Sequence, residues 1–92
     1  MPKVKVKYLN VYHSITRKAE ETITFESQLT LAELLTGIFR SYTSKLREQV
    51  LDENNSLKPH AWIMINKERE KNLQRELKDG DVVVFSLPIV GG

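Results

Sequence analysis

Polar and apolar residues alternate strictly near the start of the chain, from residue 3 to residue 9. Valine and tyrosine occupy one side of this segment and lysine the other, which is the period of a half-buried β-strand. Residues 20–26 alternate threonine or glutamate with isoleucine and phenylalanine and predict a second strand. The polar and basic stretch between them, residues 10–18, predicts a turn. The two strands are therefore predicted to form an antiparallel hairpin.

A helix is predicted to begin after Thr30. Thr30 and Glu33 form a capping box, because each side chain can satisfy a backbone N–H at the start of the helix. Apolar residues then recur at spacings of three and four: Leu31, Leu34, Leu35, Ile38, Phe39 and Tyr42. Gly37 costs about 1 kcal/mol relative to alanine unless close packing against a strand requires its missing side chain. We expect this apolar stripe to cover a sheet.

The rest of the chain supplies the other strands of that sheet. In order, the pattern predicts a short helix over 44–51, a polar loop over 52–56, a strand over 61–65, a short edge strand near 69–71, a turn over 78–81 and a last strand over 82–87. Residues 82–85 are continuously apolar, so we expect the last strand in the centre, beside the first. The order predicts an α+β fold with one main helix packed across a mixed sheet of four or five strands.

Composition narrows the class of protein. Ninety-two residues, 40% of them hydrophobic and 28% charged, are typical of one globular domain. A net charge of +2 is too small to indicate a polyanionic partner. No apolar run approaches the roughly 20 residues of a membrane-spanning helix, and residues 1–5 lack the apolar segment of a secretion signal. We therefore expect a cytoplasmic protein that does not contact a membrane.

The printed sequence ends in a thin apolar segment with two glycines. We expect residues 1–87 to fold as a domain and residues 88–92 to form a flexible C-terminal tail. Gly91 and Gly92 lack side chains, so such a tail can pass through a narrow channel and present its carboxylate. The residues before them could anchor and guide it: Leu87, Pro88, Ile89 and Val90. A frayed end is the alternative interpretation.

The absence of cysteine restricts the chemistry of the chain. It excludes a disulfide framework, a thiolate zinc site, a cysteine nucleophile and a side-chain persulfide. A protein of this composition that handles sulfur must carry it elsewhere. The carboxyl group of Gly92 could hold sulfur as a thiocarboxylate after activation by a partner.

In this order, these motifs resemble the ubiquitin-like β-grasp sulfur carriers. That family includes the small subunit of molybdopterin synthase, the thiazole-pathway sulfur carrier and related small modifiers of archaea and eukaryotes. The resemblance extends from residues 4–6 through the helix start at 31–35 to the motif Leu-Lys-Asp-Gly-Asp-Val at 77–82 and the terminal Gly91 and Gly92. The motif at 77–82 and the terminal pair are its most specific parts.

Two features depart from the family pattern. Lys67 stands where family members commonly have a glycine of positive φ after the third strand, and we expect Asn66 to take that conformation instead. The long polar stretch over 52–58 is the second departure, and surface loops accommodate such insertions at low cost.

The resemblance implies that Gly92 is the working residue and that the chain is a carrier, not an autonomous enzyme. An adenylating enzyme of the ubiquitin-activating type would use ATP to activate the Gly92 carboxylate, and sulfur from a persulfide would displace AMP. The large catalytic subunit of molybdopterin synthase, or another sulfur acceptor, would then receive the sulfur. The chain itself would bind no cofactor.

Other functions remain open from the sequence. A ubiquitin-like modifier would join the activated Gly92 to a lysine amine. An adaptor or RNA-binding module would use a basic patch with Tyr8 and Tyr12 nearby. The patch would comprise Lys3, Lys5, Lys7, Arg17 and Lys18. Binding of nucleic acid is not expected, because the sequence lacks a dense basic run. No metal site is expected, because His13 and His60 are far apart and lack carboxylate neighbours at ligand spacing. Trp62 is expected in the core or an interface.

Overall fold

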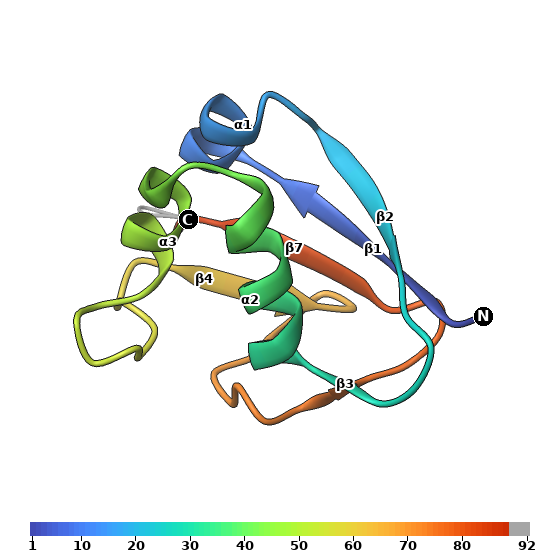
Figure 1. The fold of residues 1–92 in the computed structure, drawn as a ribbon. Coiled ribbons are helices and arrows are strands. Elements are labelled where there is room, and N and C mark those ends of the chain that lie inside the picture. Colours follow the sequence, from blue (N-terminus) through green and yellow to red (C-terminus); the bar gives the residue numbers. More distant parts are fainter. Residues whose placement is uncertain (89–92) are drawn as a thin grey trace.

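The computed structural model describes residues 1–88 and contains a five-stranded mixed sheet (Figure 1). The strands lie in the order β2 (Glu20–Thr24), β1 (Lys3–Tyr8), β7 (Val82–Ser86), β4 (Trp62–Ile65) and β5 (Glu68–Arg69). The last strand, β7, runs parallel to β1 and antiparallel to β4, so it occupies the centre of the sheet. The hairpin of β1 and β2 and the central position of β7 are both confirmed.

A second, two-stranded sheet was not predicted. It pairs β3 (Leu29–Thr30) with β6 (Glu76–Leu77) in antiparallel register. Both strands have two residues, so neither shows a period in the sequence. Leu31 N and Ala32 N, at the start of the following helix, donate to carbonyl groups of Arg75 and Leu73, which extends the contact between these two parts of the chain.

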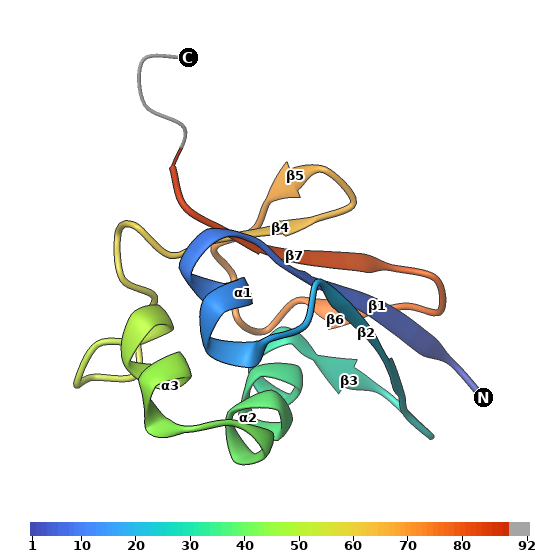
Figure 2. The ribbon, with the colours of Figure 1, turned by 90° about the horizontal axis from the view of Figure 1, so that it is seen from above.

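The main helix, α2 (Leu31–Ser41), lies across one side of the large sheet with α3 (Ser44–Val50) beside it (Figure 2). The capping box is formed as predicted: Glu33 N donates to Thr30 Oγ1 at 3.2 Å, and Thr30 N donates to Glu33 Oε1 at 2.9 Å. The short helix predicted over 44–51 is confirmed as α3. The hypothesis that Gly37 permits close packing is wrong, because a Cβ there would meet no atom of the described residues within 4 Å.

The turn predicted over residues 10–18 is instead largely a helix, α1 (Asn10–Thr16). Asn10 and Arg17 both have positive φ, at 54° and 61°, and so turn the chain into and out of this short helix. Tyr12 and Thr16, four residues apart, face the protein interior. The ring of Tyr12 packs edge-on against Phe85 with centroids 5.7 Å apart. With seven residues, α1 is too short to show a helical period in the sequence, so it was not predicted.

The core fills the space between the sheet and the helices. Alternate residues of each long strand face this side of the sheet, which we call the inner face: Val4, Val6, Tyr8, Ile63, Ile65, Val83 and Phe85. All of them are at most 1% exposed. The helices contribute Leu31, Leu34, Leu35, Ile38, Leu46 and Val50 to the same cluster. The apolar stripe of α2 therefore covers the sheet as expected, with Phe39 and Tyr42 at its partly exposed margin.

The turn that follows β4 and the turn that precedes β7 both contain residues with positive φ. Asn66 has φ of 52°, as expected, and Lys67 also has a positive φ of 74°. The amide of Asn66 donates to Asp81 Oδ1 at 2.8 Å and accepts from Val82 N at 3.0 Å, which joins the two turns. Gly80 has φ of 88°. These contacts fix the register of β4 against β7.

Candidate functional site

The residues predicted to carry the function follow β7 directly. Leu87 is partly buried against the core, and Pro88 is the last described residue. Ile89, Val90, Gly91 and Gly92 lie outside the described residues. The structure therefore describes the position from which the predicted tail would leave the domain, and the boundary between residues 87 and 88 stays a prediction. Because β7 is central, this position lies at the end of the middle strand of the sheet.

The side of the sheet away from α2, which we call the outer face, is apolar over β4 and β7. Trp62, Met64, Val82 and Val84 alternate with the core residues and are half-buried, although no helix of the described residues covers them. They line a shallow hollow with a volume of about 810 Å³. Leu87 and Leu9 belong to the same hollow, and Leu9 is 46% exposed. An uncovered apolar surface of this kind marks a contact site for another molecule.

Basic groups surround the apolar outer face. Lys7 and Lys67 line the hollow, and the Arg69 guanidinium lies 4.2 Å from the centroid of the Trp62 ring. A guanidinium stacked on an indole holds the ring flat against the sheet and leaves a positive charge at its margin. Such a surface matches a partner with an apolar centre and acidic groups at its rim. Trp62 is thus placed where an interface residue was expected.

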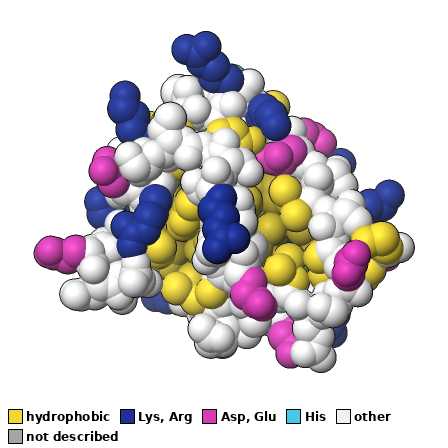
Figure 3. Space-filling view, in the orientation of Figure 1, with side chains coloured by type: hydrophobic (Ala, Val, Ile, Leu, Met, Phe, Trp, Pro, Cys, Tyr) yellow, Lys and Arg dark blue, Asp and Glu magenta, His cyan; other side chains and the backbone are white. Residues whose placement is uncertain are grey.

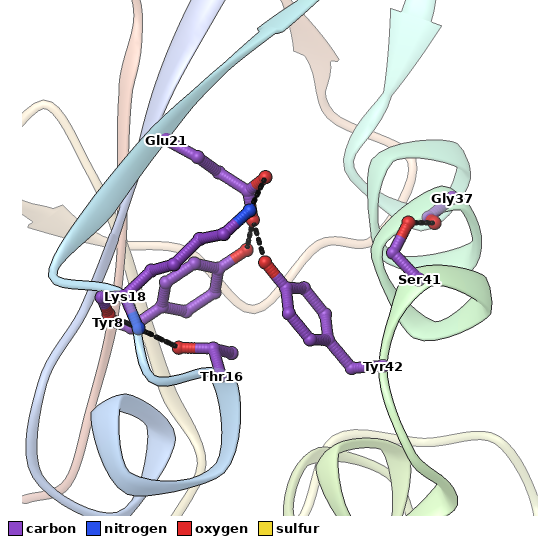
Figure 4. A network of polar contacts seen from close by, with 7 residues as sticks. All are labelled: Tyr8, Thr16, Lys18, Glu21, Gly37, Ser41 and Tyr42. Carbon is purple, nitrogen blue, oxygen red and sulfur yellow. Dashed lines mark hydrogen bonds and ion pairs between the residues drawn. The ribbon is translucent and has the colours of Figure 1, made fainter.

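A network of polar contacts joins the far end of α2 to the hairpin of β1 and β2 (Figure 4). Tyr8 and Tyr42 each donate a hydrogen bond of 2.6 Å to Glu21 Oε2. Lys18 Nζ lies 3.6 Å from Glu21 Oε1 and 5.7 Å from the centroid of the Tyr42 ring. Sequence reasoning did not find this cluster, because its members are far apart in the chain. It fastens α2 over the core.

The network changes the ionisation of its members. Burial alone would raise the pKa of the Glu21 carboxyl, but the hydrogen bonds from Tyr42 and Tyr8 and the charge of Lys18 outweigh it and lower the pKa. Burial and the hydrogen bond to Glu21 raise the pKa of the Tyr8 hydroxyl. Glu21 is therefore an anion held by neutral tyrosines.

The aromatic platform that a nucleic-acid module would need is not formed by Tyr8 and Tyr12. Both rings are 1% exposed and pack against Phe85 in the core. Of the basic residues predicted to accompany them, Lys5 forms an ion pair with Glu20 and Lys18 an ion pair with Glu21. The alternative of an RNA-binding module therefore lacks the exposed aromatic residues that it would have used beside the basic patch.

Residues 1–88 contain neither a cluster of metal ligands nor a membrane-spanning helix. Over that range, no three histidine or acidic side chains come together in a way that could hold a metal ion, and His13 and His60 are both exposed. Over the same range, no helix has the length and apolar content needed to cross a bilayer.

Several solved structures are similar to this chain over nearly its whole length. Small archaeal modifier protein 1 of Haloferax volcanii has a TM-score of 0.82 at 15% identity, with 97% of this chain and 100% of that chain covered. The putative molybdopterin converting factor, subunit 1, of Pyrococcus furiosus has a TM-score of 0.77 at 29% identity, with 97% and 100% covered. Small archaeal modifier protein 1 of Methanosarcina acetivorans has a TM-score of 0.78 at 22% identity, with 100% and 98% covered. No protein-family model matches the sequence, and no curated protein matches it.

The chain thus has the ubiquitin-like β-grasp fold that its sequence pattern predicted. The solved structures that resemble it are small sulfur carriers and modifiers with this fold, so the predicted resemblance to the ubiquitin-like β-grasp sulfur carriers is confirmed.

Proposed function

We propose that this protein is a sulfur carrier that accepts sulfur at the carboxylate of Gly92 and donates it for molybdopterin synthesis, as the small subunit of molybdopterin synthase. The observation that carries the proposal is the uncovered apolar outer face, which leads to Leu87 and Pro88 at the end of the central strand. A surface for docking and the exit of the predicted tail therefore lie side by side. The similarity to the Pyrococcus furiosus protein, at 29% identity, supports the molybdopterin branch.

The proposed chemistry takes place at one carboxyl group. A carboxylate oxygen of Gly92 attacks the α-phosphate of ATP, pyrophosphate leaves, and the acyl adenylate is a good acyl donor. A persulfide sulfur then displaces AMP, and a thiol cleaves the resulting acyl disulfide to leave the thiocarboxylate. ATP binds to an activating enzyme of the ubiquitin-activating type in this scheme, and this chain holds no cofactor.

The roles of the body and the tail differ in this proposal. The body docks through the outer face, and the residues from Leu87 to Val90 guide Gly91 and Gly92 into the partner's reaction site. The large catalytic subunit of molybdopterin synthase, or another sulfur acceptor, takes the sulfur in the final step. The protein is in this sense an accessory subunit, because its described residues supply a surface and its tail supplies the reacting carboxyl.

The intact mass of the protein isolated from its own cells tests the proposal. We expect a species heavier by the exchange of one oxygen for one sulfur, with the change localised to the last peptide. The same spectrum establishes the residue with which the chain ends. Deletion of Gly92 should abolish sulfur transfer without changing thermal unfolding. Sulfur transfer that persists in the deletion variant would overturn the proposal.

A second candidate is a ubiquitin-like protein modifier, which the similarity to two small archaeal modifier proteins favours. The same activated Gly92 carboxyl would then acylate a lysine amine of a target protein. Peptides branched from Gly92 to lysine, recovered from whole-cell digests, would identify this activity. Their absence together with a thiocarboxylate on the isolated protein would favour the carrier.

A further inference from the structure

One edge of the large sheet has no neighbouring strand in the described part of the chain. β2 is the outermost strand on that side. Phe25 N donates to the carbonyl of Pro2 at 2.9 Å, and Lys5 N donates to the carbonyl of Asp81, just before β7, instead of to Thr22, which lies opposite it. Hydrogen bonds alternate along an antiparallel pair, so Thr22 and Thr24 direct their backbone N–H and C=O groups away from β1. The backbone of β2 is thus open to another strand.

An apolar groove runs beside this open backbone, between β2 and α2. Apolar side chains reach the surface on this side of the helix in Figure 3. The groove has a volume of about 220 Å³ and is lined by Ile23, Thr24, Phe25, Leu29, Glu33, Leu34, Gly37 and Ile38. We call it the edge groove. A Cβ on Gly37 would meet nothing within 4 Å, so the missing side chain leaves the groove open instead of accommodating a strand of this chain.

The edge groove is closed at one end by the polar network described above. Tyr42, at the end of α2, donates to Glu21 on β2 and so draws helix and strand together there (Figure 4). The Glu21 carboxylate also accepts from Tyr8, so it is already fully engaged. The open length therefore begins at Thr22 and ends near Glu26, which is exposed. This length accommodates a short extended segment.

We propose that the edge groove binds an extended segment of another protein, which adds a strand beside β2. Backbone hydrogen bonds to Thr22 and Thr24 would give the segment its position, and its alternate side chains would enter the groove. Because the lining is apolar and the volume is small, these side chains are aliphatic. Glu26 and Glu33 carry negative charge at one end and at the rim of the site, so the segment has lysine or arginine at its flanks.

In the register that pairs two β2 strands about Thr22, a second copy of this chain fits the site less well than a separate segment does. If two β2 strands paired antiparallel about Thr22, Glu21 of each copy would lie opposite Ile23 of the other. The Glu21 carboxylate is engaged by Tyr8 and Tyr42 and would be brought against an apolar side chain. The occupant is therefore a strand whose inward positions are all apolar.

A synthetic peptide tests the proposal directly. The probe is an amidated heptapeptide, Lys-Thr-Val-Thr-Leu-Thr-Lys, with the isotope-labelled full-length protein observed by nuclear magnetic resonance. We expect saturable amide shifts confined to β2 and the first turns of α2, with a Kd at or below about 1 mM. The same peptide N-methylated at alternate residues should bind at least about tenfold more weakly, because it lacks donors for the strand.

Three protein variants separate this site from the others. Gly37→Leu fills the groove and should weaken peptide binding at least about tenfold, whereas the matched Thr36→Leu, on the same helix but facing α3, should not. Deletion of Gly92 should leave peptide binding unchanged, so this test is independent of the proposed sulfur chemistry. No amide shifts, shifts on the outer face around Trp62, or equal binding by Gly37→Leu would each overturn the proposal. So would concentration-dependent β2 shifts without peptide, which would indicate self-pairing.

Discussion

The two faces of the central strands are equally apolar in sequence but differ in what covers them. On β7, Val83 and Phe85 face inward and are at most 1% exposed, whereas Val82 and Val84 face outward and are half-buried. β4 repeats this division, since Ile63 lies opposite Phe85 and Met64 lies opposite Val84. Within residues 1–88, the helices cover the inner face alone. An apolar outer face without a helix therefore indicates that its cover comes from another molecule.

The largest loss of stability is expected from the inner face. Phe85→Ala removes a fully buried ring that packs against Tyr8 and Tyr12, so it should lower the free energy of unfolding by about 3–5 kcal/mol. Chemical denaturation measures this change. Val84→Ala, on the next residue but the outer face, should cost less than about 1 kcal/mol. Equal losses at the two positions would show that the two faces do not differ as described.

The polar network that fastens α2 over the inner face should contribute the next largest effect. Glu21→Gln removes the charge that Tyr8, Tyr42 and Lys18 stabilise, and should cost about 1–2 kcal/mol at pH 7. The folded pKa of Glu21 is lowered, so this contribution is fully present above the unfolded value of about 4.3. It is lost as the pH falls through the lower folded pKa.

Denaturation at several pH values measures this dependence. The stabilities of the unmodified protein and of Glu21→Gln should converge only as the pH falls below the lowered folded pKa of Glu21. Glu20→Gln is the matched control, because Glu20 is exposed and pairs only with Lys5; it should change stability by less than about 0.5 kcal/mol. A pH-independent difference between the Glu21 variant and the parent would contradict this account.

Substitution on the outer face should affect partner recognition more than folding. Met64→Lys places a charge on the half-buried apolar surface, where the side chain can extend into solvent, and should cost about 1 kcal/mol or less. The addition of sulfur to Gly92, or charging, should nevertheless fail. The intact mass of the variant isolated from its cells measures this. Thr36→Lys introduces the same charge on α2, which lies on the other side of the sheet, and should leave charging unchanged. Normal charging of Met64→Lys would show that the outer face is not the docking surface.

The smallest change in stability is expected at the edge groove, where α2 leaves part of the inner face of β2 uncovered. Gly37→Ala should raise the free energy of unfolding by about 0.5–1 kcal/mol, because alanine favours the helix and its Cβ meets nothing within 4 Å. Thermal or chemical denaturation would detect the gain. A loss of stability would mean that the groove is closed in solution and that the helix packs against β2 more tightly than described.

Local patterns in the sequence were sufficient for most of the fold. Strict alternation gave β1, the capping box at Thr30 gave the start of α2, and the apolar run from Val82 gave the central strand. Elements too short to show a period were missed: α1 has seven residues, and β3 and β6 have two each. Their stability comes from contacts with distant residues, such as Tyr12 against Phe85, which no local pattern contains.

The site could be predicted only in part, for a related physical reason. Leu87 and Pro88 were predicted as site residues because they come shortly before the glycine pair in the sequence, and their role stays a prediction. The outer face was not found, because continuous apolar residues in a strand do not reveal which of its faces the chain itself covers. The cluster around Glu21 was missed because Tyr8, Glu21 and Tyr42 meet only after the helix packs on the hairpin.

Because β7 lies between β1 and β4, both faces of the large sheet depend on its insertion. Val82–Ser86 must be inserted between β1 and β4 before either the core or the outer face exists. Without β7, neither the core residues Val83 and Phe85 nor the outer residues Val82 and Val84 are in place. A partner that docks on the outer face, as proposed above, would therefore bind only molecules in which β7 has already been inserted.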